Sequence, residues 1–181
     1  RREDPRDVLV NKMGLPLNQL PSGVRIGTSS PRRVALINAL RSDISVLPIR
    51  GNIDTRIEKA YGEDFDGVVL AAAGLLRLGR QGEIAEYLST EEFTPAVGQG
   101  ALALEIRSND RDTLNIVSRF DHWPTRVAVS AERAFLAAMG GGAASPTEGI
   151  LGGRQATTVL TRATWIAGSI FMLLALVLSI M

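Results

Sequence analysis

Apolar residues show two kinds of spacing along residues 24–94, one typical of strands and the other typical of helices. Short apolar runs at residues 24–27, 46–49 and 67–71 have the length of buried strands. Between and after them, apolar positions recur at helical spacing over residues 32–41, 52–61, 73–78 and 84–88. Strands that alternate with helical segments of about 10 to 15 residues are typical of a parallel sheet covered on both faces. We therefore predict an α/β fold for this part of the chain.

The pattern changes on both sides of this region. Residues 1–21 are polar in character, with a modest apolar run at Val8–Val10. Residues 101–106 alternate between apolar and polar as a half-buried strand does. Helical spacing returns over residues 110–120 and 124–139. We expect one α/β domain with shorter flanking segments.

The last 19 residues, 163–181, contain no charged side chain. A helix of that length rises about 28 Å, close to the thickness of the hydrocarbon layer of a membrane. Trp165 lies near the start of the segment, and Arg154 and Arg162 precede it, as interfacial and cytoplasmic residues do. This pattern predicts a C-terminal hydrophobic helix that is a candidate membrane anchor.

Charge and composition remove several classes of function. The 181 residues carry a formal net charge of +1, so no bulk positive field favours a nucleic acid. The chain has no cysteine, which excludes disulfides and thiolate metal sites. We expect no metal and no nucleic-acid partner.

Arginines gather where the predicted strands turn into helices. Gly27-Thr28-Ser29-Ser30 follows the first strand, and Ser30 and Pro31 suit the cap and first position of a helix. Arg32 and Arg33 come next, so backbone N–H groups, hydroxyls and two guanidiniums converge on one place. That combination favours a carboxylate or phosphate.

Three more arginines lie beside later strands. Arg50 and Arg56 flank the turn after the second strand, and Arg77 follows the third. Parallel sheets bind ligands outside the carboxyl ends of their strands. Because like charges at neighbouring loops repel unless an anion joins them, the set predicts an anion site.

Four segments in order carry a family resemblance. They are GTSSPRR at residues 27–33, RGNIDTR at 50–56, LAAAGLLRLG at 70–79 and PAVGQGAL at 95–102. Over residues 1–142 the chain resembles the porphobilinogen deaminase (hydroxymethylbilane synthase) family of tetrapyrrole biosynthesis. The resemblance implies a transferase that joins four porphobilinogen units with release of ammonia, on a dipyrromethane cofactor. It also implies a monomer in the cytoplasm.

The resemblance also implies which residues bind. Porphobilinogen carries acetate and propionate groups, and a guanidinium can hold each carboxylate through two hydrogen bonds. Gln99 has two open interpretations: it orients a ligand, or it satisfies backbone groups at an interdomain hinge. The residues expected to bind cofactor or substrate are Thr28, Ser30, Arg32, Arg33, Arg50, Arg56, Arg77 and Gln99.

By the same resemblance the fold is periplasmic-binding-protein-like, with a parallel-sheet domain and partial flanking domains. Residues 101–106 would return to the sheet of the family's first domain. The expected division is a crossover at 1–21, the anion-binding domain at 22–95, a return segment at 96–120, the start of a third domain at 121–142, a linker at 143–162 and the hydrophobic helix at 163–181.

The chain departs from the family pattern in three ways. Ala143 stands where the family has the cysteine that carries the cofactor, so covalent attachment is not possible. The front of the family's first domain is missing, and no residue here can take the place of its lysine and aspartate, which stand near the reacting carbon. Residues 144–181 replace the rest of the third domain. We therefore expect an incomplete, inactive fragment with no catalytic residue present. A shift of reading frame near residue 143 and a genuine fusion both explain the tail.

Two other functions compete with this interpretation. A non-enzymatic solute-binding module of the periplasmic-binding-protein type would use the same sheet edge to hold an anion. A membrane-tethered protein would be defined by residues 163–181.

Overall fold

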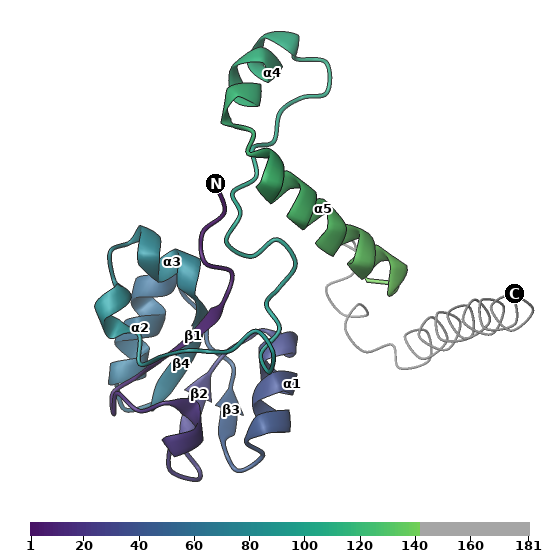
Figure 1. The fold of residues 1–181 in the computed structure, drawn as a ribbon. Coiled ribbons are helices and arrows are strands. Elements are labelled where there is room, and N and C mark those ends of the chain that lie inside the picture. The colour runs from purple at the N-terminus through teal and green to yellow at the C-terminus, as the bar shows by residue number, and fades with distance from the viewer. Residues whose placement is uncertain (142–181) are drawn as a thin grey trace, which may run out of the picture. The chain divides into compact units, whose positions relative to one another are not determined.

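A five-stranded mixed sheet forms the centre of the chain (Figure 1). The computed structural model describes residues 1–141, and the chain divides into two units, Arg1–Val129 and Ser130–Met181. The strands are β1 (Asp7–Asn11), β2 (Arg25–Gly27), β3 (Ser45–Leu47), β4 (Gly67–Ala71) and β5 (Glu86–Tyr87), in the order β3-β2-β4-β1-β5. β2 pairs in parallel with β3 and β4, whereas β1 runs antiparallel to β4 and β5. The predicted α/β fold is confirmed. The sheet was predicted to be parallel and is mostly so, since β1 alone among its strands runs in the opposite direction.

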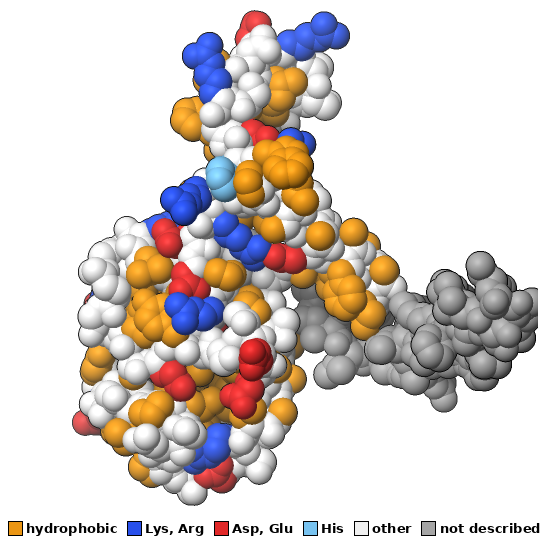
Figure 2. All heavy atoms as spheres, in the orientation of Figure 1, with side chains coloured by type: hydrophobic (Ala, Val, Ile, Leu, Met, Phe, Trp, Pro, Cys, Tyr) orange, Lys and Arg blue, Asp and Glu red, His pale blue; other side chains and the backbone are white. Residues whose placement is uncertain are grey.

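Capping residues mark the beginnings of α1 and α2. The α-helices are α1 (Pro31–Leu40), α2 (Ile53–Tyr61), α3 (Ala72–Arg77), α4 (Arg111–Val117) and α5 (Trp123–Ala138), and the 3₁₀ helices are Leu17–Gln19, Gln81–Glu83 and Ser118–Phe120. Ser30 caps α1, and Asn52 caps α2 by accepting a bond of 2.9 Å from the Thr55 N–H. Basic and acidic side chains are interspersed over the face seen in Figure 2, in keeping with the small net charge.

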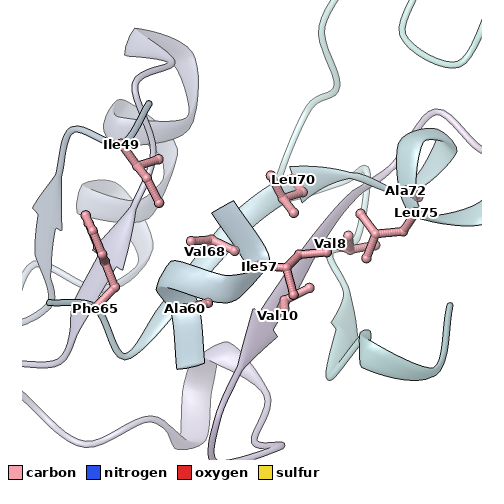
Figure 3. Close-up of a cluster of buried hydrophobic side chains, with 10 residues drawn as sticks. All are labelled: Val8, Val10, Ile49, Ile57, Ala60, Phe65, Val68, Leu70, Ala72 and Leu75. Carbon is pink, nitrogen blue, oxygen red and sulfur yellow. The ribbon is translucent and has the colours of Figure 1, made fainter. Parts of the chain in front are cut away.

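Two apolar clusters lie on opposite faces of the sheet. Because successive side chains of a strand alternate between faces, Val8 and Val10 pack with α2 and α3, whereas Leu9 packs with α1. The first cluster, shown in Figure 3, consists of Val8, Val10, Ile49, Ile57, Ala60, Phe65, Val68, Leu70, Ala72 and Leu75. The second includes Leu9, Ile26, Ile37, Val69 and Phe93. These two clusters fix the strands that carry the site.

Three sequence predictions about individual elements were incomplete or wrong. The polar-looking first segment contributes β1, whose five residues are all buried next to β4. Residues 84–88 are not a helix: Ala85 and Leu88 donate backbone hydrogen bonds to β1, and β5 forms there. Pairing with β1 is a tertiary contact that helical spacing cannot reveal. The proposed domain boundaries stay predictions.

The third correction concerns residues 101–106, which form no strand in the described part of the chain. The helices after them, α4 and α5, contain no buried residue. No helix within residues 1–141 is both long and apolar enough to cross a membrane. The hydrophobic helix predicted at 163–181 and the linker at 143–162 lie outside the described residues.

Candidate functional site

A fully buried carboxylate, Asp7, lies at the centre of the arginine-rich edge of the sheet. It is the first residue of β1 and pairs with Ala71, the last residue of β4. Because β1 runs against the other strands, its beginning lies beside the carboxyl end of β4. That is the edge at which parallel sheets present their ligand-binding loops.

Two consecutive arginines from the first turn of α1 hold this carboxylate. Arg33 Nη2 lies 2.7 Å and Arg33 Nε 3.1 Å from Asp7 Oδ1, and Arg32 Nη2 lies 2.6 Å from Oδ2. Both arginines also donate to backbone carbonyls. Arg33 Nη1 donates to the Val69 carbonyl, and Arg32 Nη1 donates to the Thr94 carbonyl. Pro31 and the cap at Ser30 start the helix so that both guanidiniums point at β1.

The cluster carries more positive than negative charge. Burial lowers the pKa of the Arg33 guanidinium, and the charge on Asp7 opposes that shift. The guanidinium nevertheless stays charged at any ordinary pH. Arg56 lies near enough to repel Arg33. Two guanidiniums on one carboxylate, with a third close by, leave an excess positive charge that an anion would balance.

Gln99 completes the shell around Asp7. Its Nε2 donates to Asp7 Oδ1 at 3.0 Å and to the Pro5 carbonyl at 2.6 Å. The Gln99 carbonyl accepts from Arg2 Nε at 2.9 Å. These hydrogen bonds join the turn at residues 95–100 to the start of β1. The side-chain amide of Gln99 therefore binds both the Asp7 carboxylate and the backbone.

An open groove of about 640 Å³ lies beside this cluster. Ser29 Oγ bonds both the N–H and the carbonyl of Ile49, which joins the loop after β2 to the loop after β3. Arg50 is exposed, and Arg56 Nε donates to the Gly51 carbonyl at 2.8 Å. The lining consists of Thr28, Ser29, Pro31, Val34, Ala35, Val46, Pro48, Ile49, Arg50, Gly51 and Arg56. Its mixture of apolar walls and guanidiniums suits an organic anion.

Two further predicted residues hold the loops around the groove and the 95–100 turn. Thr28 is buried and its Oγ1 accepts a bond from the Ser30 N–H at 3.3 Å, so it shapes the loop. Arg77, at the end of α3, donates from Nη2 to the Gly100 carbonyl at 2.7 Å and does not line the groove. Ala143 lies outside the described residues. The predicted residues therefore fall into four groups. Arg32, Arg33 and Gln99 contact Asp7. The groove is lined by Thr28, Arg50 and Arg56, Ser30 caps α1, and Arg77 bonds the 95–100 turn.

Asp7 was missed from the sequence. The available signal was weak: an acidic residue stands directly before the apolar run Val8–Val10. A charged side chain at the beginning of a fully buried strand is rarely buried itself unless it has a partner of opposite charge. Only the pairing of β1 with β4 brings Asp7 to Arg32 and Arg33.

Comparisons with known proteins identify a family for the first part of the chain. Residues 1–115 match the family model described as porphobilinogen deaminase, dipyromethane cofactor binding domain. A porphobilinogen deaminase of Brevibacillus brevis is 52% identical over 146 residues, covering 81% of this chain and 47% of that protein. Those of a Roseiflexus species and of Alkaliphilus metalliredigens are 48% and 52% identical, with 48% and 46% of their lengths covered. The chain spans about half the length of these curated relatives.

A second family model matches the other end of the chain. Residues 130–181 match the model of the preprotein translocase SecG subunit. That match overlaps α5 and extends over the uncharged segment 163–181. The first family model covers well over half of the chain, and the relatives agree with it over 146 residues. The chain belongs to the porphobilinogen deaminase family.

Proposed function

We propose that residues 1–100 bind the carboxylates of porphobilinogen and of a dipyrromethane, in a hydroxymethylbilane synthase-type reaction. The observation that carries the proposal is the pair Arg32 and Arg33 around buried Asp7, next to a groove with two further arginines. The acetate and propionate groups of porphobilinogen are anions, and they can balance the excess positive charge of these guanidiniums.

The residues present fit the cofactor named by the family model. The groove is wide enough for a pyrrole ring, and its apolar wall can pack against the ring while guanidiniums bind the carboxylates. When bound, a dipyrromethane supplies the free pyrrole carbon at which the first substrate unit is added. The residues proposed to bind are Ser30, Arg32, Arg33, Arg50 and Arg56, with Thr28 shaping the loop and Arg77 and Gln99 acting from the 95–100 turn.

Asp7 is proposed to position the binding arginines. Its side chain is fully buried and does not line the groove, and its two oxygens already accept bonds from Arg32, Arg33 and Gln99. It therefore orients the guanidiniums and does not contact the substrate.

The chain by itself is proposed to bind without turnover. Ala143 has no thiol, so a cofactor cannot be held by a thioether at that position. Binding that is equal in the ground and transition states does not lower the chemical barrier. The incubation of the purified full chain with porphobilinogen is expected to give no oxidised uroporphyrin above the blank, and turnover would contradict this part.

Binding is tested by calorimetry with porphobilinogen and the full chain in a mild non-ionic detergent. Arg50→Gln removes an exposed guanidinium of the groove. The substitution is expected to weaken binding about tenfold, because that factor corresponds to the free energy of one partly screened charge-assisted hydrogen bond. Arg111→Gln, exposed on α4 and outside the groove, is the matched control. Equal affinities in both variants would refute the groove as the site. Raised salt should weaken the wild-type affinity as well.

The finer fold assignment is also a proposal. A mostly parallel sheet with an anion groove at its carboxyl edge supports a periplasmic-binding-protein-like lobe. A solute-binding module of that type would bind simple dicarboxylates as well as it binds porphobilinogen. Calorimetry with succinate distinguishes the two, since the proposed enzyme-type site requires the pyrrole.

Membrane attachment is the second candidate function. The uncharged segment 163–181 and the match of residues 130–181 to the SecG subunit model both support it. A match to a family model is unexpected for an out-of-frame product, which favours a fusion over a reading-frame shift. Fractionation of cells expressing the chain tests it: a membrane-bound product that resists alkaline carbonate is expected. A wholly soluble, monomeric product would instead support a cytoplasmic protein.

A further inference from the structure

The hydroxyl of Ser29 joins two loops at the point where the pairing of β2 with β3 ends. Backbone pairing extends as far as the Thr28 N–H, which donates to the Leu47 carbonyl at 2.9 Å. Pro48 follows and has no N–H to donate. Ser29 Oγ then donates to the Ile49 carbonyl at 2.7 Å and accepts from the Ile49 N–H at 3.0 Å. One hydroxyl thus supplies both of the hydrogen bonds that a neighbouring strand would give to Ile49.

Ile49 requires these two partners because it is buried. It is 2% exposed and packs in the first apolar cluster (Figure 3), which keeps water from its backbone. Buried N–H and carbonyl groups are almost always paired, since an unpaired one costs free energy. The next residue is Arg50, which is exposed and lines the groove. The contact that holds the Ile49 backbone therefore sets the point from which the Arg50 side chain extends.

The turn that carries Arg50 is also held by helix α2. Lys59 Nζ donates to the Arg50 carbonyl at 3.1 Å, and Arg56 Nε donates to the Gly51 carbonyl at 2.8 Å. Side chains therefore bond three consecutive carbonyls, those of residues 49, 50 and 51. Two of these side chains come from α2, which the turn itself begins. Ser29 comes from the loop before α1, so of the three it is the one that fixes the turn relative to α1.

The Ser29 hydroxyl is not available to bind an anion directly. A serine hydroxyl has one hydrogen, and this one is donated to the Ile49 carbonyl. An ionised carboxylate only accepts hydrogen bonds, so Ser29 would have to give up Ile49 in order to bind one. Any effect of Ser29 on ligand affinity is therefore exerted through the backbone that it holds.

We propose that Ser29 is a positioning residue for Arg50. Its bridge to Ile49 fixes the loop before α1 against the turn after β3, and it thereby holds the Arg50 guanidinium where a ligand carboxylate can meet it. A preorganised group binds more tightly because less conformational freedom is lost when the ligand arrives. This inference rests on the proposed function, since it concerns the same groove, and it adds a residue that acts without touching the ligand.

A double-mutant cycle on the full chain, measured by calorimetry with porphobilinogen in a mild non-ionic detergent, tests the proposal. Ser29→Ala is expected to weaken binding about fivefold when Arg50 is present, the effect of leaving one side chain to be ordered by the ligand. In an Arg50→Gln background the same substitution should change the affinity less than about twofold.

Two further variants separate positioning from a general loss of structure. Ser29→Thr keeps the hydroxyl at an exposed residue and should bind as wild type does. Ser22→Ala removes the hydroxyl that donates to Asp43 Oδ2, outside the groove, and is the matched control with unchanged affinity. Hydrogen exchange of the Ile49 amide without ligand should be faster in Ser29→Ala than in wild type and Ser29→Thr.

Three results would overturn the proposal. Equal exchange of the Ile49 amide in wild type and Ser29→Ala would mean that the bridge does not protect it. Equal affinities of these two proteins would mean that the bridge does not affect binding. A loss of the same size with and without Arg50 would show that Ser29 acts independently of that residue. In all three cases wild type still binds porphobilinogen; if wild type itself does not bind, the proposed function fails and the positioning role fails with it.

Discussion

Residues 1–100 and residues 101–141 have similar apolar spacing but differ in what it achieves. In the first region β1 and β4 are buried on both faces, and every buried side-chain nitrogen or oxygen in the described chain has a hydrogen-bond partner. In the second, α4 and α5 form at the predicted positions, yet none of their residues is buried. Local pattern is enough to specify a helix, whereas burial needs a partner surface. The first region has that surface in its own sheet.

The largest expected effect comes from breaking the ion cluster of the first region. Asp7→Asn leaves Arg32 and Arg33 without their carboxylate, and removing one partner of a buried ion pair typically costs about 3–5 kcal/mol. Urea unfolding of the full chain followed by circular dichroism should show this loss. Glu58→Gln, exposed on α2, is the control and should change the free energy of unfolding by about 0.5 kcal/mol or less. An unchanged midpoint for Asp7→Asn would mean that another anion holds the arginines.

Cavity formation separates the two regions directly. Ile57→Ala removes a side chain that is 1% exposed beneath the sheet and should cost about 2–5 kcal/mol. Ile116→Ala makes the same chemical change on α4, where the side chain is exposed, and should leave the unfolding midpoint almost unchanged. Comparable losses in the two variants would show that α4 is buried in solution, contrary to the comparison.

The junction at Gly100 offers a smaller test. A Cβ added at Gly100 would overlap the Glu3 carbonyl oxygen. The residue also has a φ of +86°, which residues with a side chain rarely adopt. Gly100→Ala should therefore cost about 1–3 kcal/mol and loosen the bond between the Glu3 N–H and the Gly100 carbonyl. Gly82→Ala, with open space around it, is the matched control. Equal unfolding midpoints would show that residues 1–6 do not hold the 95–100 turn.

The smallest expected effect is a pH dependence within the first region. Hydrogen bonds from Arg25, with Lys12 beside it, hold the pKa of Asp66 well below its usual range. Because the folded pKa is below the unfolded one, the stabilisation is full above about pH 5 and is lost as the pH falls toward the folded pKa. The free energy of unfolding should drop between pH 5 and pH 3 by about 1 kcal/mol more in wild type than in Asp66→Asn. Parallel pH curves would contradict this.

Sequence reasoning was accurate wherever one segment carried the information. The strand at 67–71 and the cap at Ser30 were predicted at the observed positions. The errors fall where two segments meet. Residues 84–88 became a strand because β1 pairs with them, and residues 101–106 did not become one because no strand lies beside them in the described part. A pattern along one segment holds no information about its neighbour.

For the candidate site, the sequence alone predicted arginines at the ends of strands and a capped helix start, and it carried the motifs that resemble one family. Only the tertiary structure decided how those arginines are divided. Antiparallel pairing of β1 with β4 carries Asp7 to Arg32 and Arg33, while Arg50 and Arg56 line a groove and Arg77 bonds a turn. The physical reason is that an arginine's hydrogen-bond partners depend on distances between segments far apart in sequence, and these are set by the sheet.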